Sequence, residues 1–391
     1  MKHLVLLEIL FIYDIYAKVH TETLLEQHIF SDYNKIVLPR TNSSKPIKVS
    51  LHSYLGDLSY LREAENVLET NMYFHVEWTD DFLKWNLSKY NVKELAVDYQ
   101  KLWLPDIFII NGLGDSRYLP VQNTLVHVSY NGFVSWWPGG NIKTKCKLYV
   151  SKYPFDSQLC KLILEPWKLS VEQQTFEIAQ IAMDDLPTPF EENANWEVTD
   201  IKQVTHMFAF YGYYNMAHYE LRIYLKRRVL YHVFNIVFPV LLMSIISMCS
   251  YLIPPSSGEK MSVCVSIFLS FAVYVTIINN ELPRTASGVC YFGLYLFTQL
   301  AISGCTIVLS ALVLHIYHKE GKCQVPGPCN SGKESKNRVT DCVGIEGTPV
   351  KETVRQNDNK AFAIKLDYLF FKLCFILNLM SFVVYLILSN S

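Results

Sequence analysis

The sequence predicts an α+β membrane protein: an extracellular, mostly antiparallel, Ig-like β-sandwich followed by a four-helix transmembrane bundle. Three observations lead to this fold class. Up to about residue 229, polar and apolar side chains alternate with the period of strands. Apolar segments of about 20 residues follow, each long enough to cross the hydrocarbon core of a membrane. One of these segments carries its polar residues along a single helical face.

The first segment, residues 1–17, is predicted to be a signal peptide. It combines Lys2, an apolar run and the small residue Ala17. Because Glu8 and Asp14 interrupt the apolar run, a plain hydrophobic first helix is the alternative. A short amphipathic helix is expected next, over residues 21–31.

Residues 18–229 are predicted to form the β-sandwich domain. Short runs with period-two alternation are separated by Pro, Gly or Asn, which is typical of a sandwich. The expected strands lie at 49–55, 72–78, 108–111, 125–130, 133–137 and 219–225.

Two features place this domain outside the cell. Asn42 and Asn86 begin Asn-x-Ser triplets and are candidate glycosylation sites. Cys146 and Cys160 form a lone pair, which indicates one disulfide formed in an oxidising compartment, with two free buried thiols as the alternative.

The apolar segments are expected at 230–252, 260–278, 288–317 and 370–388. Residues 230–317 thus hold membrane helices one to three, 318–365 form a cytoplasmic linker, and 366–391 hold the fourth helix and an extracellular C-terminus. The basic residues at 226–228 oppose this orientation under the positive-inside rule, but long translocated domains are exempt from that rule. Both termini are therefore expected outside, in a multi-pass protein of the plasma membrane.

The second membrane segment has two different faces. Its polar face is a stripe about 100° wide, formed by Glu259, Ser262, Ser266, Leu269, Val273, Ile277 and Asn280. The opposite face is formed by Cys264, Phe268, Phe271, Val275 and Ile278. Aligned polar groups within a membrane indicate a water-lined path, whereas serines that bond back to the preceding turn are the alternative.

Several function classes are disfavoured by composition and motifs. A net charge of -1 argues against nucleic acid as a partner. No nucleotide-binding loop, metal-spaced cluster or nucleophile-base signature stands out, so we expect no enzyme, no cofactor and no metal site.

Several motifs, in order along the chain, resemble the pentameric Cys-loop ligand-gated ion channels, in their nicotinic-like, cation-selective branch. Between Cys146 and Cys160 lie thirteen residues with the core Tyr153-Pro154-Phe155-Asp156. Upstream, Trp103-Leu104-Pro105-Asp106 matches the Trp-x-Pro-Asp motif of the family. Downstream, Pro239 lies in the first membrane segment, and residues 257–260 (Ser-Gly-Glu-Lys) match the start of the pore helix.

This resemblance implies a ring-shaped homo- or hetero-pentamer that a small-molecule agonist opens for monovalent cations. An amine is the default agonist, and membrane lipid surrounds the ring. The second membrane helix would line the pore. A non-conducting or accessory subunit of a heteropentamer, with an orphan ligand, is the alternative.

The resemblance also assigns roles within the pore. Glu259 would form the carboxylate ring that favours cations, and Ser262 and Ser266 would replace part of the ion's hydration shell. Leu269, with Val273 and Ile277, would form a hydrophobic constriction. Asn280 occupies a position where many cation channels carry an acid.

The agonist site implied by the resemblance lies between two subunits. Trp167 and the tip tyrosines Tyr211, Tyr213 and Tyr214 would form one face, and Tyr73, Ser135 and Trp137 the other. Aromatic faces attract a cation. Ile110 stands where nicotinic subunits carry a tyrosine, and the tip lacks their vicinal cysteines, so the agonist stays open.

The resemblance finally implies a coupling zone between the two domains. Glu63, Asp156 and Arg227 match an acidic-basic cluster of the family. Pro154 and Phe155 would press on the link that contains Pro283. A static structural bridge is the alternative.

Overall fold

The computed structural model describes residues 20–121, 124–178, 193–210, 214–281, 289–319 and 350–390. Contacts within the chain divide it into two compact units. The sheet unit comprises Met1–Tyr149 and Ser157–Arg228, and the helical unit comprises Val150–Asp156 and Val229–Ser391. The predicted signal peptide and most of the predicted linker lie outside the described residues.

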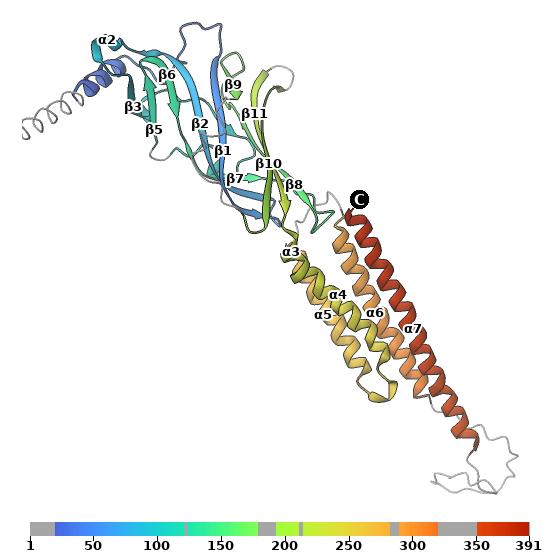
Figure 1. Ribbon diagram of the computed structural model, residues 1–391. Helices are drawn as coiled ribbons and strands as arrows, with labels where there is room; N and C mark the ends of the chain where they lie inside the picture. Colours follow the sequence, from blue (N-terminus) through green and yellow to red (C-terminus); the bar gives the residue numbers. More distant parts are fainter. Residues whose placement is uncertain are drawn as a thin grey trace, which may run out of the picture. The chain divides into compact units, whose positions relative to one another are not determined.

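The sheet unit contains two sheets after a helix at residues 20–30, which agrees with the amphipathic helix predicted there (Figure 1). The larger sheet has the order β3-β5-β6-β2-β1-β9, with β7 also paired to β2, and the smaller has the order β10-β11-β8-β4. The strands are β1 (Ile47–Arg62), β2 (Val67–Lys84), β3 (Glu94–Asp98), β4 (Phe108–Ile109), β5 (Leu125–Ser129), β6 (Asn131–Trp136), β7 (Gly139–Lys145), β8 (Ser157–Glu165), β9 (Gln174–Ile178), β10 (Trp196–Phe210) and β11 (Tyr214–Arg227). A short helix, α2 (Leu87–Tyr90), follows β2.

Period-two alternation decides which side chains enter the core of the sheet unit. Along β2, Phe74, Val76 and Trp78 are buried, whereas Tyr73 and His75, which alternate with them, face outward and stay partly exposed. β1 pairs with β2 in antiparallel register, so His52 lies opposite His75 and Tyr54 opposite Tyr73. The outer face of β1 and β2 therefore gathers aromatic and imidazole side chains.

Cys146 and Cys160 form a disulfide, as predicted, and both are buried. Cys146 directly follows β7, and Cys160 lies within β8. The disulfide closes a loop whose tip, Val150–Asp156, belongs to the helical unit rather than to the sheet unit.

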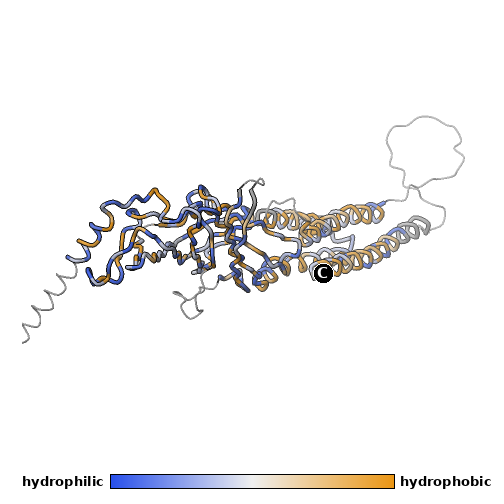
Figure 2. Tube along the Cα trace, turned by 90° about the horizontal axis from the view of Figure 1, so that it is seen from above, coloured by the Kyte–Doolittle hydropathy of each residue, from blue (hydrophilic) through white to orange (hydrophobic). Residues whose placement is uncertain are grey.

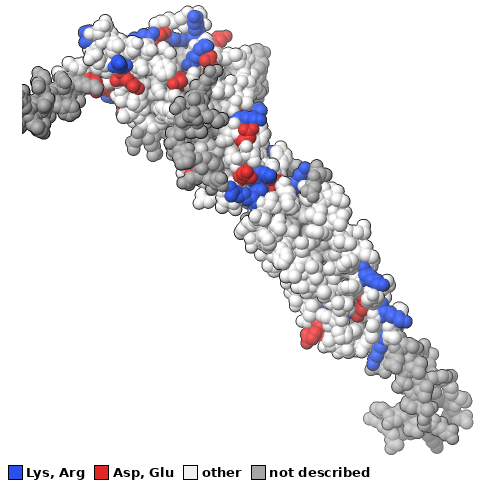
Figure 3. All heavy atoms as spheres, viewed as in Figure 1, with Lys and Arg blue, Asp and Glu red and all other residues white. Residues whose placement is uncertain are grey.

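Among the described residues, the helical unit contains four helices long and apolar enough to span a membrane, which confirms the number predicted. Hydrophobic residues predominate along these helices (Figure 2). The first span, Val229–Leu252, is composed of α3 (Val229–His232), the π-helical η4 (Val233–Val237), α4 (Phe238–Cys249) and the 3₁₀ turn η5 (Ser250–Leu252). The others are α5 (Lys260–Glu281), α6 (Tyr291–Tyr317) and α7 (Val350–Asn390), and α7 begins well before the segment predicted at 370–388. In Figure 3 most of the visible helical surface carries no charged side chain, and the charges gather towards the end where α5 and α7 begin.

Polar side chains connect three helices inside the helical unit. Ser244 of α4 donates to Gln299 of α6 at 3.1 Å, and Gln299 donates to Ser381 of α7 at 2.9 Å. Because hydrocarbon offers no hydrogen-bond partner, these groups satisfy one another. The chain of hydrogen bonds joins α4, α6 and α7.

Pro239 leaves one backbone carbonyl of the first span without its usual helical partner. A proline has no N–H and clashes with the carbonyl four residues earlier, which here is that of Asn235. The helix widens to a π-turn over Val233–Val237, and the hydroxyl of Tyr274 on α5 donates to the Asn235 carbonyl at 2.6 Å. Tyr274 therefore fastens α5 to the irregular turn of the first span.

We expect Tyr274→Phe to lower stability by about 1 kcal/mol, because it leaves the Asn235 carbonyl without this donor in a membrane. The measurement is the apparent unfolding temperature of the full chain in detergent. Tyr368→Phe, at an exposed tyrosine of α7, is the matched control. Equal unfolding temperatures for the two variants would contradict the assignment.

Candidate functional site

The polar stripe of α5 lies on the exposed side of the helical unit. Leu269, Val273 and Ile277 are each more than half exposed, at 57%, 59% and 53%. Glu259, Ser262 and Ser266 are exposed as well. The side chain of Asn280 lies outside the described residues.

The opposite face of α5 packs into the unit. Cys264, Phe271 and Ile278 are buried, and Phe268 and Val275 are half-buried. Cys264 contacts the hydroxyl of Ser310 on α6 at 3.5 Å. One face of α5 therefore packs against other helices of the same chain, and the opposite face is not covered by this chain.

Hydroxyl groups on the exposed side of α5 bond back to the helix. Ser266 donates to the carbonyl of Ser262 at 2.8 Å, and Ser270 donates to that of Ser266 at 2.9 Å. The back-bonding considered as the alternative to water lining thus occurs, but it uses only the hydroxyl proton. The oxygen lone pairs remain available to water or a cation.

Glu259 directly precedes α5, and its carbonyl accepts from the N–H of Val263 at 3.1 Å. Its exposed carboxylate therefore lies at the positive end of the helix macrodipole. A carboxylate here both complements that dipole and presents negative charge to the solvent.

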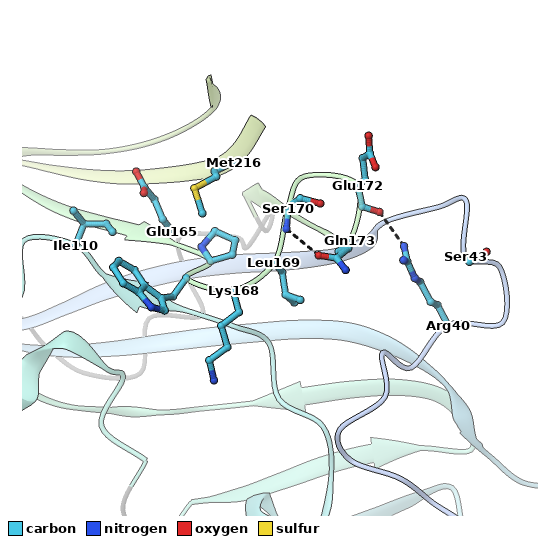
Figure 4. A pocket seen from close by; sticks show the side chains of 12 residues that line it. Arg40, Ser43, Ile110, Glu165, Lys168, Leu169, Ser170, Glu172, Gln173 and Met216 are labelled. Atoms are coloured by element: carbon cyan, nitrogen blue, oxygen red, sulfur yellow. Dashed lines mark hydrogen bonds between the residues drawn. The ribbon is translucent and has the colours of Figure 1, made fainter. Parts of the chain in front are cut away.

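In the sheet unit, Trp167 and Ile110 line a shared pocket of about 900 Å³ (Figure 4). Trp167 is 60% exposed, and its ring packs against Phe108 at 4.7 Å between centroids. Glu165 and Met216 line one end of the pocket, whereas Arg40 and Ser43 lie at the other end.

Asp106, the acid of the Trp-x-Pro-Asp motif, positions the loop that carries Trp167. Its carboxylate accepts from the backbone N–H of Lys168, the residue after Trp167, at 2.5 Å. Gln174 exchanges two hydrogen bonds with the backbone of Asp106, at 3.0 and 2.9 Å. Asp106 thus holds the loop next to the exposed indole of Trp167, and Gln174 in turn holds Asp106.

Next to Trp167, three polar side chains lie in a row across the smaller sheet. Glu165 on β8 contacts Nδ1 of His218 on β11 at 2.6 Å. The ring of His218 lies 4.2 Å from that of His206 on β10. The pocket wall therefore combines an aromatic face with a carboxylate that an imidazole orients.

The second predicted face lies on the larger sheet. Tyr73 covers two glycines, since a Cβ on Gly56 or Gly139 would come within 2.9 or 2.5 Å of its ring. Beside it, Trp137 stacks on His75 at 4.1 Å, and Nε2 of His75 lies 3.0 Å from the Ser135 hydroxyl. The structure therefore brings Tyr73, Ser135 and Trp137 together on one outer face, with His75 among them.

The protonation of His75 is set by two opposing influences. Burial, with a contribution from His52, lowers the pKa of His75. Glu77 lies 3.4 Å from Nε2 and would favour the charged form, but burial raises the pKa of Glu77 itself. Nδ1 of His75 is buried and has no hydrogen-bond partner among the described residues, which suits a neutral imidazole.

The coupling residues fall in both units. In the sheet unit, Arg227 makes a two-pronged contact with Glu63 at 2.5 and 2.9 Å, and its guanidinium lies 4.3 Å from the Trp196 ring. The Arg227 side chain is almost fully buried. This arrangement compensates a charge that would otherwise be costly to bury.

Pro154, Phe155 and Asp156 belong to the helical unit. Pro154 and Asp156 are buried, whereas Phe155 is 43% exposed. Their neighbour Tyr153 anchors the loop tip, since its hydroxyl lies 2.9 Å from Nδ1 of His232 and its ring packs against Phe292. Pro283 lies outside the described residues, as do Tyr211 and Tyr213, and Tyr214 is described only as part of β11.

Both candidate glycosylation sites are exposed, and each side-chain carbonyl accepts from a backbone N–H two residues on: Asn42 from Ser44 at 3.0 Å, Asn86 from Ser88 at 2.9 Å. Within the part of the chain that the structure describes, no group of three His, Cys, Asp or Glu side chains could hold a metal ion.

Several of these contacts were not predicted from the sequence. Glu165 and His218 showed no signal, because their pairing depends on the register between β8 and β11. Pro239 did imply an orphaned carbonyl at Asn235, but not that Tyr274 would supply its donor. Lys260, a charge at the start of an apolar segment, likewise implied a buried acid nearby, and in the structure Asp367 of α7 lies 2.5 Å from its ammonium.

Two protein-family models match this chain, and together they cover most of it. Residues 22–229 match the model of the neurotransmitter-gated ion-channel ligand binding domain, and residues 236–356 match that of the neurotransmitter-gated ion-channel transmembrane region. The chain is 30% identical over 299 residues to neuronal acetylcholine receptor subunit beta-4 of Bos taurus, an alignment that covers 76% of this chain and 59% of the relative. It is 28% identical over 299 residues to subunit alpha-3 of Rattus norvegicus, covering 75% and 59%. It is 27% identical over 293 residues to the acetylcholine receptor subunit beta-type unc-29 of Caenorhabditis elegans, covering 74% and 58%. The aligned part thus spans less than two thirds of each of these relatives.

We expect the stability of the sheet unit to fall as pH decreases below about 6.5, the ordinary pKa of histidine. The folded pKa of His75 is lowered, so the unfolded chain binds the proton more readily and gains from acidification. The stabilisation is fully present above that pH and is lost below it.

His75→Gln should flatten this dependence in apparent unfolding temperatures of the full chain between about pH 5 and 8. His127→Gln, at an exposed histidine of β5, is the control and should leave the slope unchanged. A slope for His75→Gln as steep as that of the parent protein would rule out this role of His75.

Proposed function

Because the chain belongs to the family of neurotransmitter-gated ion channels, we propose that it is a subunit of a pentameric cation channel opened by a small cationic agonist. The uncovered face of α5 carries this proposal. Its hydroxyls and Glu259 lie on the side that the chain's own helices leave open. In a ring of subunits, that face would line a water-filled axis.

The cation preference rests on Glu259. It is exposed and precedes the first turn of α5. Repeated around a ring, it would form a belt of carboxylates at one mouth of the pore, which attracts cations and repels anions. Ser262 and Ser266, one and two turns further along, would offer hydroxyl oxygens to a partly dehydrated ion.

The closed state of the pore rests on Leu269. Its side chain is exposed near the middle of α5, with Val273 one turn above it. A ring of such side chains would exclude water from a narrow stretch and so stop ions without a plug.

The agonist would bind between the face that carries Trp167 and the face that carries Tyr73 and Trp137 of a neighbouring subunit. Each aromatic face attracts a cation by about 0.5–2 kcal/mol. Glu165, beside Trp167, adds negative charge that favours an amine. Ile110, 40% exposed in the same pocket, removes one aromatic wall, which favours an agonist other than acetylcholine.

The signal from this site would travel through the buried Glu63–Arg227 pair and the loop tip that carries Tyr153. The pair belongs to the sheet unit and the tip to the helical unit. A charge pair with two discrete arrangements is one physical way to connect a binding site to a gate. The channel would lie in the plasma membrane with both termini outside.

A second candidate is an accessory subunit of a heteropentamer. In that case the face that carries Trp167 would not bind the agonist. Ile110 and the absence of vicinal cysteines near Tyr214 favour it. Recording from cells that express this chain alone, during a screen of biogenic amines, separates the two. Amine-evoked current supports the homomeric channel, and current only with a co-expressed partner supports the accessory role.

Leu269→Ser should produce a leak current without agonist, because a hydroxyl at the constriction admits water. The measurement is the resting conductance of cells that express the variant, normalised to surface protein. Val275→Ser places the same hydroxyl away from the stripe and should stay closed. A silent Leu269→Ser variant at normal surface density would contradict the gate.

Glu259→Gln should lower the ratio of sodium to chloride permeability by roughly threefold or more, because a charge at the mouth acts on each passing ion over a few ångströms. Reversal potentials in diluted sodium chloride report this ratio, and the Leu269→Ser leak allows them to be measured without the agonist. If the reversal potential stays where it is in the parent protein, Glu259 does not select cations.

A further inference from the structure

Lys260 is the neighbour of Glu259 at the start of α5, yet its side chain is fully buried while that of Glu259 is exposed. The two opposite charges at this end of the helix therefore have different surroundings. One faces solvent, and the other lies within the packed helices. On a helix, Lys260 falls on the side of Phe271 and Ile278, away from the polar stripe.

The buried ammonium of Lys260 contacts the carboxylate of Asp367 on α7 at 2.5 Å. Asp367 is 5% exposed, and the Lys260 ammonium also lies 5.7 Å from the centre of the Tyr251 ring. An ammonium in such surroundings requires an opposite charge, because desolvation is costly. Asp367 supplies it across 107 residues of sequence.

Among the side chains of α7 that the structure describes, Asp367 alone is charged and buried. Lys365 and Lys372, the charged residues of α7 nearest to Asp367, are exposed. Asp367 thus lies on the inner face of α7, in line with Ala363 and Cys374, both buried. The last helix, which lines no pore in the proposed channel, still holds one charge of the pore helix.

We propose that Asp367 determines ion selectivity by holding the positive charge of Lys260 away from the inner mouth of the pore. This inference rests on the proposed cation channel. With the pair intact, Glu259 alone decides the sign of the charge at the mouth. Without Asp367, the Lys260 ammonium has no counter-charge in its buried site. Its flexible stem then carries it to solvent beside the exposed Glu259, where each lysine cancels one carboxylate of the ring. Asp367 is a positioning residue, since it acts through Lys260.

The test compares reversal potentials in diluted sodium chloride on the Leu269→Ser background, with the chain expressed alone or, where that is silent, with the rat alpha-3 subunit. Asp367→Asn should lower the ratio of sodium to chloride permeability by roughly threefold to tenfold. The double variant Lys260→Gln/Asp367→Asn should restore the parent ratio, because the released charge is gone. Lys365→Gln, which removes an exposed charge from the same helix, should change nothing.

Rescue by the double variant separates this role from a purely structural one. If Asp367 only held α5 and α7 together, the double variant would show the same lowered permeability ratio as Asp367→Asn, since both lack the ion pair. Should Asp367→Asn fail to reach the cell surface, the sodium-to-chloride permeability ratio of the double variant still tests whether Asp367 masks Lys260. A permeability ratio equal to that of the parent supports a masked Lys260, and an increased ratio overturns it.

The outcomes also distinguish this inference from the proposed function. A parent that conducts chloride refutes the cation channel itself. A cation-selective parent whose ratio is unchanged by Asp367→Asn at normal surface density refutes only the role of Asp367.

Discussion

A lysine ammonium cannot remain in a membrane interior without a partner, and Lys260 therefore requires Asp367 in the packed helices of this protein. The pair links the first turn of α5 to α7. It also agrees with the rotation of α5, which turns Lys260 inward together with Phe271 and Ile278. Once that rotation is set, Glu259, Ser262, Ser266 and Leu269 have to lie on the other side.

The same constraint accounts for the other polar contacts of the helical unit. Tyr274 donates to the carbonyl that Pro239 deprives of its helical partner, and Gln299 of α6 connects hydroxyls of α4 and α7. Each of these groups finds its partner within the chain. The stripe of α5 differs, since its exposed hydroxyl oxygens and Glu259 face away from the chain. In a membrane such a face requires water and other subunits, which is why it argues for a pore.

In the sheet unit, the proposed agonist site consists of exposed aromatic rings that neighbouring groups hold in place. Asp106 holds the loop of Trp167, and two glycines leave room for the ring of Tyr73. Both faces also combine an imidazole with a carboxylate: His218 with Glu165, and His75 with Glu77. Each candidate ligand face therefore carries ionisable groups beside its aromatic rings and is not purely aromatic.

The sequence by itself determined the features that repeat along the chain. Period-two alternation predicted the two sheets, apolar length predicted the number of membrane helices, and the period of α5 predicted which residues share the stripe. A lone pair of cysteines predicted the disulfide. These are local properties, set by the geometry of one strand, one helix or one loop.

Tertiary structure alone decided which distant groups meet. Lys260 and Asp367, Asn235 and Tyr274, and Glu165 and His218 are joined across 107, 39 and 53 residues. It also assigned the tip of the disulfide loop to the helical unit. Such contacts depend on the rotation of each helix and the register of each strand, which only the simultaneous packing of all elements fixes.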